Sequence, residues 1–439
     1  MKIMVSREVR IVDAFKAFID TIAIYQNAVS FLIDVVNEHY VNVCGLPSQK
    51  AMTFIERLVH STSTREAFYP SFDIRFHKLP SYLRRSAIFD ALSAITLYRK
   101  NLAEWEVSDK LRKKPFLKRK RNVMPAFYRD NMFILDEENG VYRAKLKLFS
   151  DGDWKWHVFN LSQADVRNIQ KDFSLEEVKC PVLKKHGHRF TLSFVFETEA
   201  ELPKKGNKEY SICAVDIGIN NAAVCSIMKE DGTVTARRFI AFTGEEDRFN
   251  RILNERKKAH SLSKCRTHRL NRFLKNHNEN LARLTSSAIA EFASSEGAYV
   301  IVMENLNGKG KVKCSKKERL HLWRKRDIIS RVEALAHRKG MRFSTVWAAG
   351  TSKYAFDGSG QVKRDKDNHS QCTFSNGKRY NTDLSASYNI GARFFIRETL
   401  KACPETEASE AKAKVPGLSA RATCTLSTYI SLLAVRASA

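Results

Sequence analysis

The sequence lacks a C-x-x-C pair, although it contains nine cysteines. Zinc ribbons and redox-active dithiols usually hold two cysteines at this spacing, and disulfide frameworks belong to small secreted domains. The cysteines here are scattered from Cys44 to Cys424. We therefore expect reduced, mostly buried thiols, with neither a zinc ribbon nor a disulfide scaffold.

A long apolar run is missing as well. No stretch approaches the roughly 20 consecutive apolar residues that span a bilayer. The N-terminal segment MKIMVSREVRIVDAF intersperses charges with apolar residues and has no apolar core of a secretory signal. We expect a cytoplasmic protein without a membrane partner.

Acidic residues are few relative to basic ones. The chain has 48 Asp and Glu against 75 Lys and Arg, which leaves a formal net charge of +27 over 439 residues. Such an excess attracts polyanions and favours a nucleic-acid partner. The length allows two or three domains, each with its own core.

The first part of the chain has helical periodicity. In residues 81–105, apolar side chains such as Leu83, Ile88 and Leu92 recur every three or four positions, which predicts a helix within a helical region over 12–122. A basic run from Lys110 ends this region. It could be a solvated loop, but the charge of the chain favours phosphate contacts by Lys113, Lys114, Lys118, Arg119, Lys120 and Arg121.

Residues 123–205 show a different pattern, in which apolar and polar residues alternate. Stretches such as VYRAKLKLF and HRFTLSFVFE predict short strands, and the turn signals ENG and DGD separate them. We expect a small antiparallel barrel or sandwich. The polar stretch LPKKGNKE is typical of a linker into the next region.

Three acidic residues stand out in the part that follows. Asp216 interrupts the apolar strand SICAVDIGINN, where an unpaired buried carboxylate would cost several kcal/mol. Glu304 ends the apolar strand AYVIVMENL, and Asp383 lies in the first turn of a helix, where the helix dipole favours an acid. Each alone could be a solvated or capping acid.

The order of the predicted elements gives these acids a common location. The predicted order is RNase H-like. It begins with three antiparallel strands and a long basic helical stretch from about Glu245 to Ser294, and it continues with a parallel strand, a helix that ends near Gly340, a strand and a final helix. Its first and fourth strands are neighbours, so Asp216, Glu304 and Asp383 can converge. Three carboxylates suit two Mg²⁺ ions and phosphodiester hydrolysis.

At these residues the sequence resembles the TnpB family of transposon-encoded RNA-guided nucleases and their descendants, the compact type V CRISPR effectors. AVDIGINN is similar to the first RuvC motif of the family, IVMENLNG to the second and NTDLSASYNIGA to the third. The segments CPVLKKHGHRFTLSFVFE and WRKRDIISRVEALAHRKGMRF are also similar to family segments. The resemblance covers most of the chain.

The resemblance implies a multidomain α+β protein in which a RuvC-like α/β nuclease domain follows a helical recognition region and a small β-barrel wedge domain. It implies the following division of the chain: first wedge strand 1–11, recognition region 12–122, wedge 123–205, nuclease parts 206–349 and 381–400 around a loop over 350–380, and a C-terminal tail 401–439.

The resemblance also implies partners and a function. A guide RNA would pair with a double-stranded DNA target, the protein would read a short adjacent motif, and two Mg²⁺ ions would serve hydrolysis. The alternatives are a guided DNA-binding repressor without cleavage, and an RNase H-fold transposase or resolvase; the oligomeric state stays open. Basic residues of the helical stretch would contact phosphates: Arg256, Lys257, Lys258, Arg266, Arg269 and Arg272.

One segment departs from the family. Members commonly carry a four-cysteine zinc ribbon before the third motif, but here the loop over 350–380 offers only His369 and Cys372 as ligands. We expect a degenerate ribbon without zinc, from which Arg364 and Arg379 could still contact DNA. The tail begins like a flexible connector, KACPETEASEAKAKVPG, and ends in a mildly apolar segment.

Overall fold

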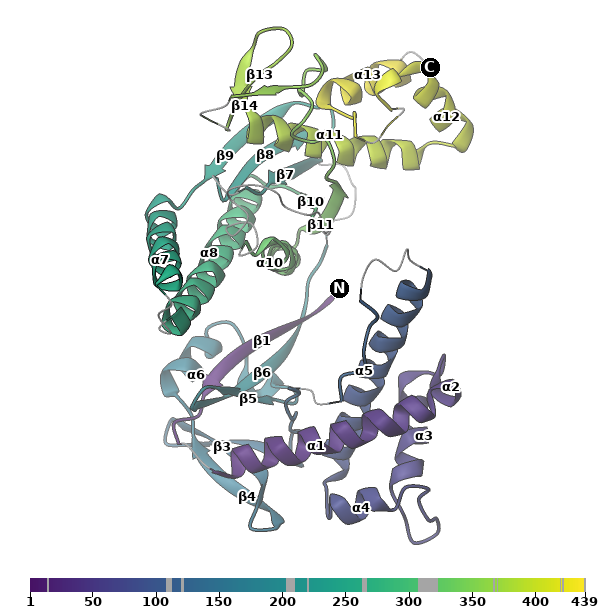
Figure 1. Ribbon diagram of the computed structural model, residues 1–439, viewed down its shortest axis with the longest axis vertical. Helices are drawn as coiled ribbons and strands as arrows, with labels where there is room; N and C mark the ends of the chain where they lie inside the picture. Colours follow the sequence, from purple (N-terminus) through teal and green to yellow (C-terminus); the bar gives the residue numbers. More distant parts are fainter. Residues whose placement is uncertain are drawn as a thin grey trace. The chain divides into compact units, whose positions relative to one another are not determined.

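The computed structural model of the chain shows a mixed α/β architecture (Figure 1). The structure describes residues 1–13, 16–107, 113–119, 122–202, 210–218, 221–262, 267–306, 323–365, 368, 370–418, 420 and 422–437. The chain divides into an N-terminal unit, Lys2–Thr198, and a C-terminal unit, Glu199–Ala439, which Met1 joins.

The N-terminal unit begins with a strand and then has a helical half. Its helices are α1 (Lys16–Glu38), α2 (Tyr40–Val43), α3 (Ser48–Val59), α4 (Ser71–Arg75) and α5 (Ser81–Val107). Helices α1 and α5 pack along each other through apolar faces that include Tyr25, Leu32 and Ile88. The Tyr25 hydroxyl donates to Asp90 Oδ2 of α5 at 2.7 Å, so the buried phenol is satisfied.

Helix α1 is long and apolar enough, by length and composition alone, to cross a bilayer. The sequence led us to expect no apolar run of that size. Its apolar face, with Phe18, Tyr25 and Val29, is buried in the core of the N-terminal unit. Packing within that core accounts for the composition of the helix.

The remaining strands of this unit belong to two three-stranded sheets. The strands are β1 (Lys2–Arg10), β2 (Phe133–Glu138), β3 (Val141–Ser150), β4 (Asp153–Asn160), β5 (Val182–His186) and β6 (Arg189–Glu199). Between β4 and β5 lie the helix α6 (Gln163–Gln170) and the short 3-10 helix η1 (Leu175–Glu177). The sheet orders are β1-β6-β5 and β2-β3-β4.

The hairpin turns beside β3 have the backbone conformation that their residues favour. Asn139-Gly140 and Asp151-Gly152 all have positive φ, as the tight hairpin turns beside β3 require. The two sheets touch through single bridges such as Ile11 with Leu161. The described strands thus form paired three-stranded sheets, and they do not show the closed barrel that was one expectation.

The C-terminal unit is built on a five-stranded sheet. Its strands are β7 (Ser211–Asp216), β8 (Ala223–Lys229), β9 (Val234–Ile240), β10 (Val300–Asn305) and β11 (Arg342–Trp347), in the order β11-β10-β7-β8-β9. β7, β8 and β9 are antiparallel, while β10 runs parallel to both β7 and β11. The strand order and directions agree with the arrangement expected from the sequence.

Helices cover both faces of this sheet (Figure 1). One face packs against α11 (Thr382–Ala402), and the other against α8 (Thr267–Ser295) and α10 (Lys325–Arg338). Gly391 lets α11 approach closely, because a Cβ there would lie 2.9 Å from Met228 Sδ and 3.3 Å from Ala214 Cβ. The predicted single helical stretch is two helices, since α7 (Thr243–Ser261) ends before α8 and packs against it.

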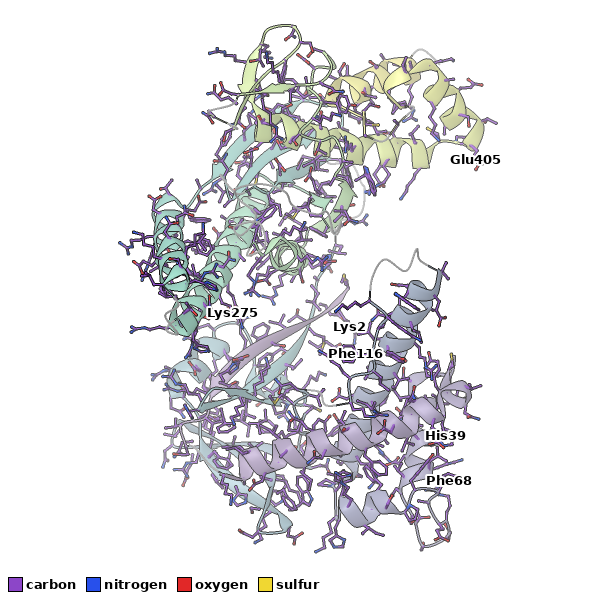
Figure 2. The ribbon with its side chains drawn as sticks, viewed as in Figure 1. Lys2, His39, Phe68, Phe116, Lys275 and Glu405 are labelled. Atoms are coloured by element: carbon purple, nitrogen blue, oxygen red, sulfur yellow. The ribbon has the colours of Figure 1, made fainter. Side chains whose placement is uncertain are left out.

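Two smaller parts complete the unit. A three-stranded sheet of β12 (Lys363–Arg364), β13 (Gln371–Thr373) and β14 (Arg379–Asn381) precedes α11. After α11 come α12 (Glu405–Lys414), η2 (Pro416–Leu418) and α13 (Leu426–Ala437), and Glu405, labelled in Figure 2, starts α12. The expected flexible connector is therefore largely helical, because residues 405–414 hold good helix formers such as Ala, Glu and Lys.

Candidate active site

Strand register places Asp216 and Glu304 on the same face of the sheet. β10 pairs with β7 from Val300 opposite Ile212 to Met303 opposite Val215, so the next step along both strands is Glu304 and Asp216. Side chains alternate along a strand, and Ile212, Val300 and their same-face neighbours pack toward α11. Both carboxylates therefore belong to the face that α11 covers.

Asp383 reaches this region from the start of α11. The side chain of Asn381 caps the helix by accepting a hydrogen bond from Leu384 N at 2.9 Å. Asp383 follows in the first turn, and its Oδ2 accepts a hydrogen bond from Asn221 Nδ2 at 3.1 Å. Asn221 comes from the turn between β7 and β8, so this bond joins the helix start to the strand that carries Asp216.

Asp216 is the acid whose electrostatics reflect the other two. Burial, and then the charges of Glu304 and Asp383, raise the pKa of Asp216 well above its usual value, while the charge of Arg364 opposes the shift. Burial also raises the pKa of Glu304, against a hydrogen bond from Thr351 and the charge of Arg393. Unbalanced negative charge of this kind favours a bound cation.

The donor set fits magnesium by its chemistry. All three groups are carboxylates, the hard oxygen ligands that Mg²⁺ prefers. Among the described residues, no group of three or more His, Cys, Asp and Glu side chains lies close enough to hold one metal ion. Asp216, Glu304 and Asp383 therefore form an acidic cluster whose members interact electrostatically without being a closed ligand set.

Four polar residues lie beside the cluster, and only Arg364 among them was named from the sequence. Thr351 donates its hydroxyl to Glu304 Oε1, Asn221 bonds Asp383, and Arg364 and Arg393 supply positive charge near the acids. Arg364 was expected to contact DNA only. Asn221 and Arg393 lie within or just beyond the quoted motifs, whereas nothing in the local sequence distinguishes Thr351 from another turn threonine.

The structure places most of the predicted phosphate contacts of the nuclease part on α7 and α8. Lys257, Lys258, Arg269 and Arg272 are exposed, whereas Arg256 is half-buried and donates to Asn271 Oδ1 at 3.2 Å. Lys275, labelled in Figure 2, is another exposed base of α8. Arg266 lies outside the described residues.

The basic run of the N-terminal unit is described only in part. Lys113, Lys114, Lys118 and Arg119 are exposed, and Lys120 and Arg121 lie outside the described residues. Arg119 forms an ion pair with Asp34 at 2.6 Å, and the Lys114 ammonium lies 5.7 Å from the Trp105 ring centroid. The Arg119 and Asp34 side chains are both largely exposed, and exposed ion pairs contribute little energy.

The ribbon-like segment has a small apolar core. Ala355, Cys372 and Phe374 are buried together, with Phe356, Val362 and Tyr380 packed against them. The Cys372 thiol donates to Tyr380 O at 3.5 Å, and His369 lies outside the described residues. Arg379 is exposed on β14, and Arg364 on β12 donates to Ser352 Oγ at 2.9 Å.

Comparison with known proteins gives matches by family model and by structure. Residues 6–150 match the model of the Aq_aa04 family. No curated protein sequence matches the chain.

The solved structures that are similar include CasPhi-2 (Cas12j) bound to crRNA, at 11% identity over 90% of this chain and 98% of that chain, with a TM-score of 0.49. The mini-RNA-guided endonuclease CRISPR-Cas_phi3 is 12% identical over 89% and 92%, with a TM-score of 0.48. The Cas12f1–sgRNA–target DNA complex is 16% identical over 89% and 99%, with a TM-score of 0.35. The structural neighbours are thus compact Cas12 effectors of low sequence identity.

Proposed function

We propose that this chain is an RNA-guided, magnesium-dependent DNA endonuclease, with Asp216, Glu304 and Asp383 as its metal-binding carboxylates. The observation that carries the proposal is the convergence of these acids: strand register places Glu304 and Asp216 on one face of the sheet, and the charges of Glu304 and Asp383 act on the buried Asp216. They come from two neighbouring strands and one helix, far apart in sequence. A purely structural role does not explain why a fold would gather three like charges at a partly buried site.

The residues of the site have distinct roles in this proposal. Asp216, Glu304 and Asp383 would hold Mg²⁺, which when bound activates water and stabilises the leaving oxygen of a phosphodiester. Asn221 orients Asp383 through its hydrogen bond. Arg364, whose charge already acts on Asp216, would attract the phosphate backbone.

Charge supports the choice of nucleic acid as substrate. The net charge of +27 and the exposed bases of α7 and α8 favour a polyanion over a small anionic metabolite. We infer a guide RNA from the resemblance of the three motifs to those of the TnpB family. Pairing between guide and target would then supply sequence specificity, while the protein reads duplex shape and a short adjacent motif.

Retention of all three carboxylates sets the proposal apart from a guided repressor without cleavage, which needs none of them. A transposase or resolvase on the same fold would act without a guide. Dependence of cleavage on RNA therefore separates a guided nuclease from a transposase or resolvase, and cleavage itself separates it from a repressor.

The test uses the full chain purified with the nucleic acid that accompanies it. We expect a structured RNA with a variable end to copurify, and cleavage of DNA that matches the variable end to require both that RNA and Mg²⁺. Ribonuclease treatment should abolish cleavage, and adding the RNA back should restore it. Undiminished cleavage by ribonuclease-treated protein would refute the guided mechanism.

A further inference from the structure

The hydroxyl of Thr351 contacts the candidate metal ligand Glu304. Thr351 lies in the turn after β11 and is 2% exposed, and Glu304 is 8% exposed. The hydroxyl lies between two acceptors, Glu304 Oε1 and Ala348 O at 3.0 Å, and its single proton is best given to the ionised carboxylate. One oxygen of Glu304 is thereby fixed.

Asn389 on α11 holds the turn that carries Thr351. Its side chain is fully buried, and its Nδ2 donates to Thr351 O and to Tyr354 O, both at 2.9 Å. Its Oδ1 accepts a hydrogen bond from Leu426 N at 3.2 Å. Both ends of the amide are thus used, one for the turn and one for the segment that leads into α13.

Arg393 repeats this bridging one helical turn further along α11. Its guanidinium donates to Trp347 O at 2.6 Å, at the end of β11, and to Ala349 O at 2.9 Å, in the turn that follows. It also donates to Ala422 O at 2.8 Å and Cys424 O at 3.2 Å in the C-terminal segment. A planar fork with three nitrogens suits this set of four carbonyls, and an ammonium group does not.

The C-terminal segment is held firmly in this position. The Tyr429 ring of α13 stacks on Phe395 of α11, with centroids 5.4 Å apart and planes at 12°. Gly350, next to Thr351, has a φ of +84°, and a Cβ there would overlap Ala422 O. The backbone of the segment therefore packs directly against the turn.

We propose that Thr351 is a positioning residue for Glu304, and that the segment Ala422–Leu426 completes its support through Asn389 and Arg393. This inference rests on the proposed function, in which Glu304 binds Mg²⁺. Mg²⁺ demands nearly ideal octahedral geometry, so a carboxylate with one oxygen already fixed loses less freedom on binding. Groups that orient a ligand in this way typically change metal affinity or activity 10- to 100-fold when removed.

The first test compares Thr351→Val, which keeps the shape and removes the hydroxyl, with Thr351→Ser, which keeps the hydroxyl. Both are measured as guide-loaded full chains. We expect Thr351→Val to raise the Mg²⁺ concentration for half-maximal cleavage about 10- to 100-fold, and to weaken the Mg²⁺-induced rise in melting temperature. Thr351→Ser should stay close to the wild-type requirement.

Two outcomes overturn the inference about Thr351. One is a Thr351→Val protein that matches Thr351→Ser in its Mg²⁺ titrations. The other is a Thr351→Val protein that melts earlier with an unchanged Mg²⁺ requirement, which would mean a structural role alone. If Glu304→Ala cuts like the wild type, the proposed function fails instead, so the two failures are distinguishable.

The second test addresses the C-terminal segment with Arg393→Lys, which keeps the charge near Glu304 and loses the four-carbonyl geometry. We expect this change to raise the Mg²⁺ requirement in the wild-type background and to have a smaller effect in the Thr351→Val background, because both act through one turn. Equal effects in the two backgrounds, or no effect in either, would overturn the role assigned to the segment.

Discussion

Asp216 combines burial with like-charged neighbours. Burial and the charges of Glu304 and Asp383 raise its pKa well above the usual value. In the folded protein the carboxyl therefore keeps its proton to a higher pH than in the unfolded chain. Its contribution to stability is present below the ordinary pKa of an aspartate and is lost as the pH rises through the raised pKa.

The consequence is that Asp216→Asn should stabilise the metal-free protein. At pH 8 the substitution removes a buried charge that its neighbours repel, so the melting temperature should rise, by about 2–4 °C for each kcal/mol gained. The gain should shrink toward pH 4, where the wild-type carboxyl is protonated. Thermal melts of the protein in EDTA at several pH values measure this.

Asp231 provides a matched control. It is an exposed acid of the β8–β9 hairpin in the same unit, and its pKa is lowered, chiefly by the hydrogen bond that its carboxylate accepts from Thr233 N at 2.8 Å. Asp231→Asn should therefore bring no gain at pH 8. A wild type that melts at or above the temperature of Asp216→Asn at pH 8 would contradict the electrostatic account of Asp216.

At the scale of elements, apolar packing holds together the segment with β12, β13 and β14. A buried group of Ala355, Cys372 and Phe374 occupies its centre, and the Phe356 and Tyr380 rings lie 5.0 Å apart at its side. Apolar burial of this kind contributes about 25 cal/mol per Å².

We accordingly predict less than one equivalent of tightly bound zinc in the guide-loaded protein. Structural zinc normally needs four ligands, and this segment of the sequence offers only His369 and Cys372. Elemental analysis of the dialysed complex measures the zinc content. A full equivalent that disappears in a His369→Ala, Cys372→Ala double variant would contradict this prediction.

The elements also show what could be predicted from the sequence. The continuous apolar runs of β7 and β10, and the turn residues Asp231 and Gly232, were sufficient to predict the strands, because local patterning determines them. The helices of the C-terminal tail were missed, since α13 owes its place to contacts with α11 such as the Tyr429–Phe395 stack. Packing between distant segments leaves little trace in local sequence.

The candidate site was predictable to a similar extent. Asp216, Glu304 and Asp383 could be named because an acid at the end of an apolar strand or in a first helical turn is conspicuous. Thr351 could not, because its importance comes from a contact with Glu304 across 47 positions of sequence. The hydrogen bonds of Asn389 and Arg393 to backbone carbonyls likewise depend on the final fold.

At the scale of the whole molecule, two compact units carry different parts of the account. The N-terminal unit supplies helices and paired sheets with an exposed basic run, and the C-terminal unit holds the acidic cluster. The chain has a net charge of +27, yet its C-terminal unit places the charges of Glu304 and Asp383 near the buried Asp216. Binding and cleavage of nucleic acid should therefore be separable functions.

The measurement that tests this separation most directly compares DNA cleavage with guided DNA binding in Asp216→Ala, Glu304→Ala and Asp383→Ala. Each change should lower the cleavage rate roughly a thousandfold or more, about 4 kcal/mol of transition-state stabilisation, because a ligand for Mg²⁺ is lost. Filter binding of the matched target should stay near wild type, since base pairing and basic residues elsewhere carry it. Asp231→Ala, an exposed acid outside the cluster, should cut normally. Cleavage at near the wild-type rate by Asp216→Ala would contradict the account.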